Sequence, residues 1–482
     1  KLTSSSVTSA SDRKDGMYGN KSNYKAALHT PRFLNRRLTL AGFGLMGIYA
    51  GITSFGKVGA ATSAPIPLPV TGLRLKVVVV GGGMAGATAA KYFRLWGGAG
   101  IDVTLVESRA NYVSNIFSSG VLNETVAYDS LNYGYESLNL RYGVKVIFGS
   151  CIDINAEQSK VTLDDGQVIT YDRLVLAPGV EFMDAWGLSS VDYVERFPHA
   201  WEAGPQTVAL ERQLHAMRDG DQFALIIPKA PYRCPPGPYE RACVVADYLR
   251  STQRAGARVT ILDENLSIQA KEQTFTRAFK ELLAPMVRYE SGCQHIRIDP
   301  TTKVIQFINQ LGEPNSIKAQ VISPIAPHRA RGAGPAGVLD RLNLNASSDR
   351  RWCPVNVLNY ESNVIKRIHI IGDASQNGMP KAGHVANQEA KICVDAVLRA
   401  IQGIDPDRSP VANSACYSTI TASTASWLTA VFQYDPSKAA MVPAGPSGAL
   451  SGGRAIESDK VNATNYRDMQ VWYKTLMADS FF

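Results

Sequence analysis

The sequence contains few cysteines, and none has a spacing that would ligate haem or a metal. There are seven among 482 residues, too few for a disulfide framework in a chain of this size. No C-x-x-C-H motif occurs, so the chain attaches no c-type haem, and no C-x-x-C pair or His/Cys cluster predicts a metal site. One pair of cysteines could still form a working disulfide in an oxidising compartment.

An excess of positive charge is lacking outside the first part of the chain. The net charge is +8, but residues 1–64 hold nine Lys and Arg against two Asp, which leaves the remainder close to neutral. A nucleic-acid-binding protein should carry a basic patch on its folded part, so the charge distribution argues against that class. The length allows two or three domains with sizeable cores.

Long apolar runs are also scarce, and the one of interest lies within residues 1–64. Arg36 and Arg37 precede a mildly apolar, glycine-rich run, and small residues follow at 59–64. This layout is typical of a twin-arginine export signal, which predicts a periplasmic protein exported in the folded state, with no integral membrane segment after signal removal. The alternative is an uncleaved membrane anchor, for which the run is barely long enough.

Residues 75–107 predict a dinucleotide-binding β-α-β unit. The segment "LKVVVVGGGMAGATAAKYFRLWGGAGIDVTLVE" passes from an apolar strand into G-x-G-x-x-G at Gly81, Gly83 and Gly86, then into a helix and a strand that ends at Glu107. The glycines open the turn to a pyrophosphate at the helix N-terminus, and the acid reaches a ribose hydroxyl. A purely structural glycine turn is the alternative.

Two later segments indicate which dinucleotide binds. "YDRLVLAPG" (171–179) and "IKRIHIIGDAS" (365–375) each read as a strand that ends in a small-residue turn. They resemble the second and third fingerprints of two-dinucleotide flavoproteins, in which the Gly-Asp acid, here Asp373, binds the ribityl chain of FAD. The helix expected after Asp373 would direct its positive N-terminal end at the flavin. The sequence therefore predicts an FAD protein.

A second β-α-β unit, at about residues 222–263, lacks the glycines that a nucleotide would need. Between the runs "FALII" and "ERACVVADYLRS" stands "PKAPYRCPPG" (228–237). Proline removes backbone donors and restricts φ, so this turn cannot enclose a pyrophosphate in the usual way. We expect that the unit keeps its fold without binding a nicotinamide, and that Cys234 lies where a phosphate would otherwise bind.

Longer motifs point to one family. The blocks "KVVVVGGGMAGATAAKY", "RFPHAWEAGPQT", "RCPPGPYERA", "WCPVN", "MPKAG" and "ACYS" resemble the flavoprotein subunit of flavocytochrome c sulfide dehydrogenase, which is related to the sulfide:quinone oxidoreductases. The resemblance covers residues 74–482. It implies an FAD-dependent sulfide:cytochrome c oxidoreductase, with sulfide as the substrate and a separate c-type cytochrome subunit as the electron acceptor.

The resemblance also implies an α/β fold with two Rossmann-like three-layer domains, a glutathione-reductase-like FAD domain and a degenerate NAD-type domain, plus a smaller C-terminal α+β domain. The expected division gives the FAD domain in two parts, the central domain between them, and a flavin-associated interface domain at the end. After the export signal at 1–64, the boundaries are 74–187 and 316–402 for the FAD domain, 188–315 for the central domain and 403–482 for the C-terminal domain.

In that family a cysteine of the "RCPPGPYE" block forms a redox disulfide with one of the "CYS" block, which implies Cys234 and Cys416 here. Spacing alone leaves Cys353 as a competing partner, and an inert buried thiol is the alternative role for Cys234. Glu240 is the candidate acid–base group, or else a carboxylate that the helix dipole stabilises. The residues predicted to contact FAD are Gly81, Gly83, Met84, Ala85, Gly86, Glu107, Ser108, Asn115, Ala177, Gly179, Gly372, Asp373, Met379, Lys381 and Trp472.

Some members of the family attach FAD covalently through a cysteine shortly after the ribose-binding acid. This sequence has Ser114 and Asn115 at that place, so we expect noncovalent FAD. Two other functions stay open: an enzyme like sulfide:quinone oxidoreductase, which should need an apolar C-terminal membrane surface, and a non-catalytic flavoprotein partner in a sulfur-oxidising complex, whose disulfide would be structural.

Overall fold

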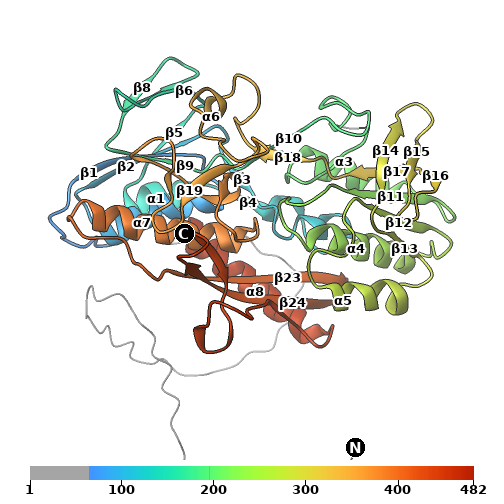
Figure 1. Ribbon diagram of the computed structural model, residues 1–482. Coiled ribbons are helices and arrows are strands. Elements are labelled where there is room, and N and C mark those ends of the chain that lie inside the picture. Colours follow the sequence, from blue (N-terminus) through green and yellow to red (C-terminus); the bar gives the residue numbers. More distant parts are fainter. Residues whose placement is uncertain (1–63, 195) are drawn as a thin grey trace, which may run out of the picture. The chain divides into compact units, whose positions relative to one another are not determined.

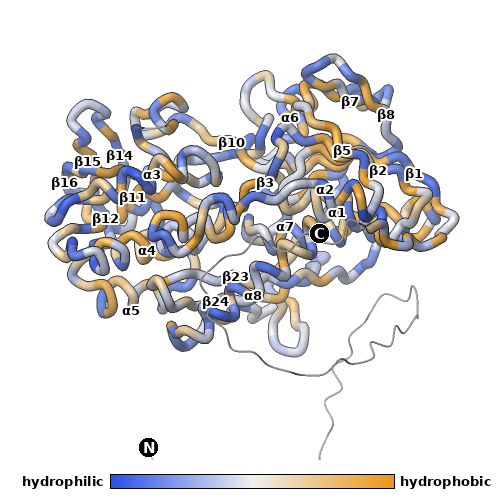
Figure 2. The backbone as a smooth tube through the Cα atoms, turned by 180° about the vertical axis from the view of Figure 1, so that it is seen from behind, coloured by the Kyte–Doolittle hydropathy of each residue, from blue (hydrophilic) through white to orange (hydrophobic). Residues whose placement is uncertain are grey.

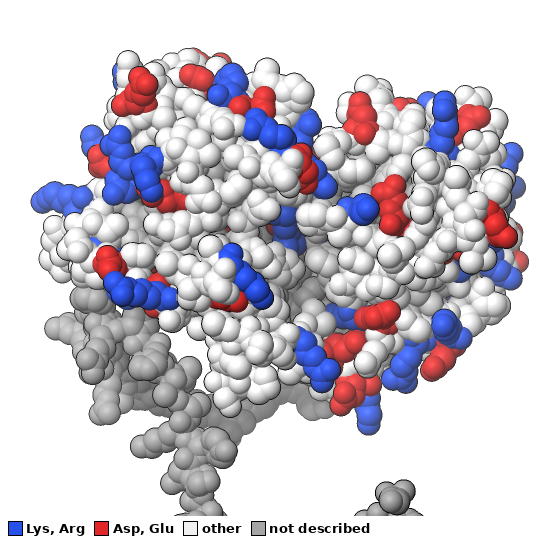
Figure 3. Space-filling model, viewed as in Figure 1, with Lys and Arg blue, Asp and Glu red and all other residues white. Residues whose placement is uncertain are grey.

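The computed structural model describes residues 64–194 and 196–482 (Figure 1). The predicted export signal at residues 1–64, except for its last residue, lies outside the described residues. Among the described residues, none of the helices combines the length and the apolar composition that a membrane span requires. Figure 3 shows acidic and basic side chains interspersed over one face of the molecule.

An eight-stranded sheet forms the centre of the FAD-type part of the fold. Its five neighbouring strands β5, β2, β1, β9 and β21 run parallel, and β1 is apolar and buried along most of its length because both faces of a parallel sheet are covered. The strands in spatial order are β22 (Ser375–Gln376), β19 (Cys353–Asn356), β20 (Glu361–Ser362), β21 (Ile368–Ile370), β9 (Arg173–Leu176), β1 (Leu75–Val80), β2 (Ile101–Glu107) and β5 (Lys145–Phe148).

Two helices and a small antiparallel sheet complete this part. Helices α1 (Met84–Gly97) and α7 (Gly383–Ala400) pack against each other on one side of the large sheet, and the strands β6 (Cys151–Asn155), β7 (Lys160–Leu163) and β8 (Val168–Thr170) lie on the other side (Figure 1). The arrangement is a three-layer fold.

The central part repeats the parallel plan on a smaller scale. Its sheet has the order β13, β12, β11, β17, all parallel, and helix α4 connects β11 to β12. The bounds are β11 (Gln222–Ile227), α4 (Gly237–Ser251), β12 (Arg258–Asp263), β13 (Val287–Glu290) and β17 (Val321–Pro324), with α3 (Pro205–His215), α5 (Glu272–Arg277) and the antiparallel β14 (Gln294–Asp299), β15 (Val304–Ile308) and β16 (Pro314–Lys318) around them.

The C-terminal part is a long hairpin followed by a helix. Strands β23 (Val411–Thr421) and β24 (Thr424–Asp435) pair antiparallel, and α8 (Ala463–Phe481) packs against β24 and α1. Strand β23 contacts both α7 and α4, so the hairpin lies beneath both parallel sheets in Figure 1. Ile420 enters the core of the central part, whereas Tyr473 and Phe481 of α8 enter the core of the FAD-type part.

Short elements connect these parts. They are β3 (Tyr112–Val113), η1 (Ser118–Val121), η2 (Tyr128–Leu131), β4 (Asn132–Tyr133), α2 (Glu136–Tyr142), β10 (Val180–Phe182), η3 (Ala278–Leu282), β18 (His328–Ala330), α6 (Val338–Arg341), η4 (Gly372–Ala374), β25 (Ala440–Pro443), η5 (Pro446–Gly448) and β26 (Ile456–Glu457). Figure 2 shows hydrophobic stretches within the main strands and helices. The expected α/β fold with two Rossmann-like units and a smaller C-terminal α+β part is confirmed.

Candidate functional site

A cavity of about 490 Å³ lies where the three parts meet. Strand ends and helix N-termini of the FAD-type part supply one portion of its wall, α4 supplies another, and β23 and α8 close it. Fifteen of the eighteen predicted site residues line it: Gly81, Gly83, Met84, Ala85, Glu107, Ser108, Asn115, Ala177, Gly179, Cys234, Glu240, Gly372, Asp373, Cys416 and Trp472.

Three of the predicted residues do not line the cavity. Gly86 provides close packing instead, because a Cβ there would lie 1.8 Å from the carbonyl oxygen of Gly81. Met379 is buried. The Lys381 ammonium donates to the carbonyl oxygens of Asp373 at 2.8 Å and Ser375 at 2.9 Å, which supports the turn after β21 from behind.

The described residues fit an FAD in this cavity. The N-termini of α1 and α7 reach the wall and have no side-chain cap, which leaves backbone N–H groups and positive dipole ends for a bound group there. Helix α4 also reaches the wall, but its Gly237 N–H is bonded to the Cys234 carbonyl. Gly83 has no atom closer than 3.9 Å to the place of a Cβ, and Gly179 has none within 4 Å. The buried Nε1 of Trp472 has no acceptor among the described residues, which leaves a donor for a bound group.

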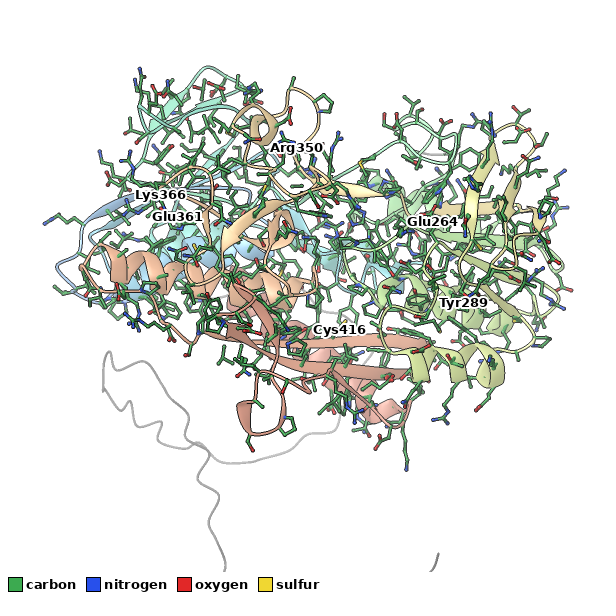
Figure 4. All side chains as sticks on the ribbon, viewed as in Figure 1. Glu264, Tyr289, Arg350, Glu361, Lys366 and Cys416 are labelled. Atoms are coloured by element: carbon green, nitrogen blue, oxygen red, sulfur yellow. The ribbon has the colours of Figure 1, made fainter. Side chains whose placement is uncertain are left out.

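Two sulfur atoms meet at one end of this cavity. The thiols of Cys234, in the loop before α4, and Cys416, on β23, lie within hydrogen-bonding reach of each other, and both are free in the structure. Cys353, the competing partner, is fully buried in β19 and does not line the cavity. In the structure Cys416, and not Cys353, therefore lies next to Cys234. Figure 4 shows Cys416 on the hairpin beneath the two parallel sheets.

The loop holds Cys234 in an unusual backbone conformation. Its φ is +59°, in the left-handed region that non-glycine residues seldom adopt. Its N–H donates to the carbonyl oxygen of Lys381 at 2.8 Å, and its own carbonyl accepts from Gly237 at 2.9 Å. A Cβ at Gly237 would lie 2.9 Å from the Cys234 sulfur and 2.8 Å from the Trp201 ring, so only glycine fits beside the thiol.

The two thiols have opposite electrostatic properties. The hydrogen bond with Cys416, together with burial, raises the pKa of Cys234 well above its ordinary value. The same hydrogen bond lowers the pKa of Cys416, and the positive charge of Lys271 adds to that effect. Cys416 is therefore the sulfur of the reduced pair that more readily carries negative charge, and the thiolate is the reactive form.

Glu240 lies beside the cysteine pair, at the start of helix α4. It lies in the first turn of α4, and its Oε1 accepts the backbone N–H of Thr419 at 2.9 Å, which joins α4 to β23. Burial raises the pKa of Glu240, so its carboxyl keeps a proton to higher pH than an exposed glutamate. A buried carboxyl beside two thiols can donate or accept a proton there.

The nucleotide site of the central part is filled by its own side chains. Asp263, at the end of β12 where an acid would bind a ribose, is fully buried. It accepts the hydroxyls of Tyr239 at 2.7 Å and Tyr289 at 3.0 Å, and the N–H of Asn265 at 2.9 Å. Figure 4 shows Tyr289 on the central part, away from Cys416.

The proline loop has its backbone donors engaged as well. Lys229 donates to Glu264 Oε2 and Ala230 to Asn265 Oδ1, each at 2.9 Å, and Arg233 donates to His328 Nε2 at 2.7 Å. The Cys234 N–H is donated to the Lys381 carbonyl, and the four prolines of the loop have no N–H, so these backbone groups are not available to a phosphate. This agrees with the expected loss of the nicotinamide site.

Several residues of the wall carried no sequence signal of their own. His384 lies in the first turn of α7, accepts the N–H of Ala415 at 2.9 Å and packs edge-on against Trp472. Arg241 is 2% exposed, and its guanidinium lies 4.8 Å from the Trp201 ring centroid. Trp201 belongs to the "RFPHAWEAGPQT" block, which contributed to the family resemblance. The sequence did not indicate its contact with Arg241.

Three family models match the chain. Residues 75–202 match "Pyridine nucleotide-disulphide oxidoreductase", residues 207–326 match "Sulfide dehydrogenase [flavocytochrome c] flavoprotein chain, central", and residues 408–481 match "Flavocytochrome c sulphide dehydrogenase, flavin-binding". The chain therefore carries the central and flavin-binding domains of a flavocytochrome c sulfide dehydrogenase flavoprotein chain, after a pyridine nucleotide-disulphide oxidoreductase domain. These are the domains of an FAD-dependent oxidoreductase.

Other proteins share parts of the chain or only the fold. A ferredoxin–NAD(+) reductase component of the p-cumate 2,3-dioxygenase system from Pseudomonas putida is 37% identical over 113 residues, and apoptosis-inducing factor homolog B from Dictyostelium discoideum is 32% identical over 110 residues. These matches cover 22% and 23% of this chain. The chain spans about a quarter of the length of these curated relatives, 27% and 26%.

Two solved structures show the fold. The sulfide:quinone oxidoreductase from Aquifex aeolicus has a TM-score of 0.66 at 16% identity, over 84% of this chain and 91% of that one. The covalent putidaredoxin reductase–putidaredoxin complex has a TM-score of 0.57 at 17% identity, over 82% and 92%.

We predict that Gly81→Ala loses most of its FAD. Gly81 has a φ of +98°, and a Cβ there would lie 2.3 Å from the carbonyl oxygen of Ala177, another wall residue. The ratio of FAD to protein after purification, read from absorbance, measures the effect. Gly72→Ala is the matched control, because Gly72 also has a positive φ of +74° but open space around it. A wild-type FAD ratio in Gly81→Ala would contradict the prediction.

Proposed function

We propose that this flavoprotein oxidises sulfide at the Cys234–Cys416 pair. The observation that carries the proposal is the meeting of these two sulfurs at the wall of a cavity that fits FAD. FAD, when bound, supplies a two-electron acceptor beside the pair. Gly81, Gly83 and Glu107 would hold its dinucleotide end, and Asp373 and Trp472 would contact it farther along.

The chain's own step is a thiol–disulfide exchange. In the oxidised pair, HS⁻ attacks one sulfur, one S–S bond forms and another breaks, and one cysteine carries a persulfide while the other leaves as a thiolate. The negative charge that entered on HS⁻ ends on that thiolate, so the sulfide sulfur is oxidised to the sulfane level and the cysteine pair takes up its two electrons. A second HS⁻ would remove the sulfane sulfur as HSS⁻ and leave both cysteines reduced, with the bound FAD as the acceptor for the two electrons that must leave before the disulfide forms again.

Glu240 would accept and donate the protons of this exchange. Because burial raises the pKa of Glu240, its protonated form persists to higher pH than that of an exposed glutamate and is lost as the pH rises through the raised pKa. It can accept the proton of the attacking hydrosulfide or return one to a cysteine sulfur. Its hydrogen bond to Thr419 fixes the carboxyl relative to β23.

The acceptor and the compartment complete the proposal. The family implies electron transfer to a c-type cytochrome subunit, and the Arg36–Arg37 segment favours twin-arginine export to the periplasm. The alternative with a quinone acceptor would need an apolar C-terminal surface. Helix α8 uses Met469, Tyr473 and Phe481 inside the fold, which leaves that alternative without support from this helix.

An anaerobic titration tests the reaction. Sulfide should bleach the flavin absorbance of the purified protein, whereas NADH should not, because the nucleotide site of the central part is filled by Tyr239 and Tyr289. Bleaching by NADH with no response to sulfide would overturn the proposal.

Variants of single cysteines test the pair. Cys234→Ser and Cys416→Ser should each slow bleaching by sulfide at least about a hundredfold, since neither can form the disulfide that sulfide attacks. Cys353→Ser should bleach at the wild-type rate, because Cys353 lies outside the cavity. Turnover that survives Cys234→Ser would favour a non-catalytic partner role.

The FAD is proposed to be noncovalent. The Oγ of Ser114 donates to the carbonyl oxygen of Ile116, and Asn115 lines the cavity and accepts the N–H of Ala203. Neither offers the sulfur nucleophile that covalent attachment needs. Precipitation with acid should leave a colourless pellet and a yellow supernatant, and a yellow pellet would refute noncovalent binding.

A further inference from the structure

A buried lysine lies beside the cysteine pair and has no part in the exchange described above. Lys271 stands at the start of α5 with a φ of +57° and is only 2% exposed. A buried ammonium is costly unless its charge and its N–H groups are compensated. Among the described residues, no Asp or Glu oxygen forms an ion pair with it. Groups other than a directly paired carboxylate must therefore compensate the charge and the N–H groups of this ammonium.

The hydrogen bonds of Lys271 place its ammonium against the strand that carries Cys416. Nζ donates to Ser418 Oγ at 3.0 Å and to the carbonyl oxygen of Ser426 at 3.1 Å. Ser418 and Ser426 are opposite each other in the β23–β24 hairpin. Because side chains alternate along a strand, Ser418 shares its face of β23 with Cys416, two residues earlier.

The charged and titratable groups around this ammonium come from every neighbouring element. They are Cys416 on β23, Glu240 on α4, Cys234 in the proline loop and Glu457 on β26. Burial lowers the pKa of Lys271, and the negative charges of these four groups, Cys416 first, oppose that effect. Arg241 is the other nearby cation, and it faces Glu240 and Cys234.

We propose that the Lys271 ammonium is the counter-charge for the thiolate that appears on the Cys234–Cys416 pair when its disulfide opens. The proposal rests on the function proposed above. Opening the disulfide leaves a full negative charge in a partly buried site, and a cation held by Ser418 and Ser426 is already in place to balance it. Lys271 is thus a positioning residue that favours the reduced pair and sets its reduction potential.

The thiol chemistry of Lys271→Met tests this role without sulfide. After anaerobic reduction with dithiothreitol, the holoprotein is alkylated with iodoacetamide from pH 5 to pH 10, and modification of each cysteine is followed by mass spectrometry. Removal of the ammonium should raise the apparent pKa of the more reactive thiol of the pair by at least about one unit, which slows its alkylation at neutral pH about tenfold.

The equilibrium potential of the pair provides a second readout. Against defined dithiothreitol buffers, a tenfold loss of stability of the reduced pair shifts its midpoint by about 30 mV toward more negative values. Lys271→Arg keeps the charge and should restore most of the wild-type pH profile. A merely structural lysine would move neither the pH profile nor the potential.

Lys91→Met is the matched control. Lys91 is also buried, at 6% exposure, and its ammonium donates to three carbonyl oxygens at the end of α8, of Ala478, Asp479 and Phe482. The Lys91→Met substitution removes a buried ammonium that lies away from the two sulfurs. The pH dependence of thiol alkylation should therefore match that of the wild type. An unchanged profile in Lys271→Met, or equal shifts in both variants, would overturn the proposal.

If Lys271→Met fails to fold, the wild-type protein still tests the proposal. Thiolate absorbance of the reduced wild type should then show one thiol of the pair titrating below the ordinary cysteine value of about 8.5, and titration of both above it would overturn the proposal. These measurements are separate from the function itself. If sulfide fails to bleach the flavin of the wild type, the proposed function is refuted. If the apparent pKa of the reactive thiol is unshifted, the role of Lys271 is refuted.

Discussion

The attachment of strand β23, and of the turn that follows it, to one face of helix α4 is the constraint on which the site depends. Glu240 and Asp247 lie seven residues apart on one face of α4, and they accept the N–H groups of Thr419 and Ala422 at 2.9 and 2.7 Å. The register of β23 with β24 shifts between Thr419 and Thr421, where these bonds are made. This attachment brings Cys416 to Cys234, although the two belong to separate parts of the fold.

The proline loop shows how a nucleotide-binding unit can be converted to another use. In a Rossmann unit the turn after the first strand offers its N–H groups to a pyrophosphate. Here those donors are absent or bonded to Glu264, Asn265, His328 and Lys381, and Asp263 is saturated by tyrosine hydroxyls. The same turn, freed from phosphate binding, presents a cysteine to the neighbouring flavin cavity.

Local motifs predicted the dinucleotide end of the cavity well. Gly81, Gly83, Glu107 and Asp373 line it, because a glycine turn between a strand and a helix has nearly the same geometry wherever it occurs. Met379 and Lys381 were expected to contact FAD from their place in the "MPKAG" block. Neither lines the cavity, since a chain position near a turn does not determine the direction of a side chain.

The sequence by itself determined the fold class, the FAD fingerprint and the absence of a glycine phosphate turn in the central part, since these follow from short-range rules on strand periodicity and on backbone φ. Only the tertiary structure placed Cys416 rather than Cys353 beside Cys234, and only it revealed Lys271 and His384 against strand β23. These positions depend on how β23 packs against α4 and α7. Such packing is settled by the burial of apolar surface over the whole chain, and no local spacing encodes it.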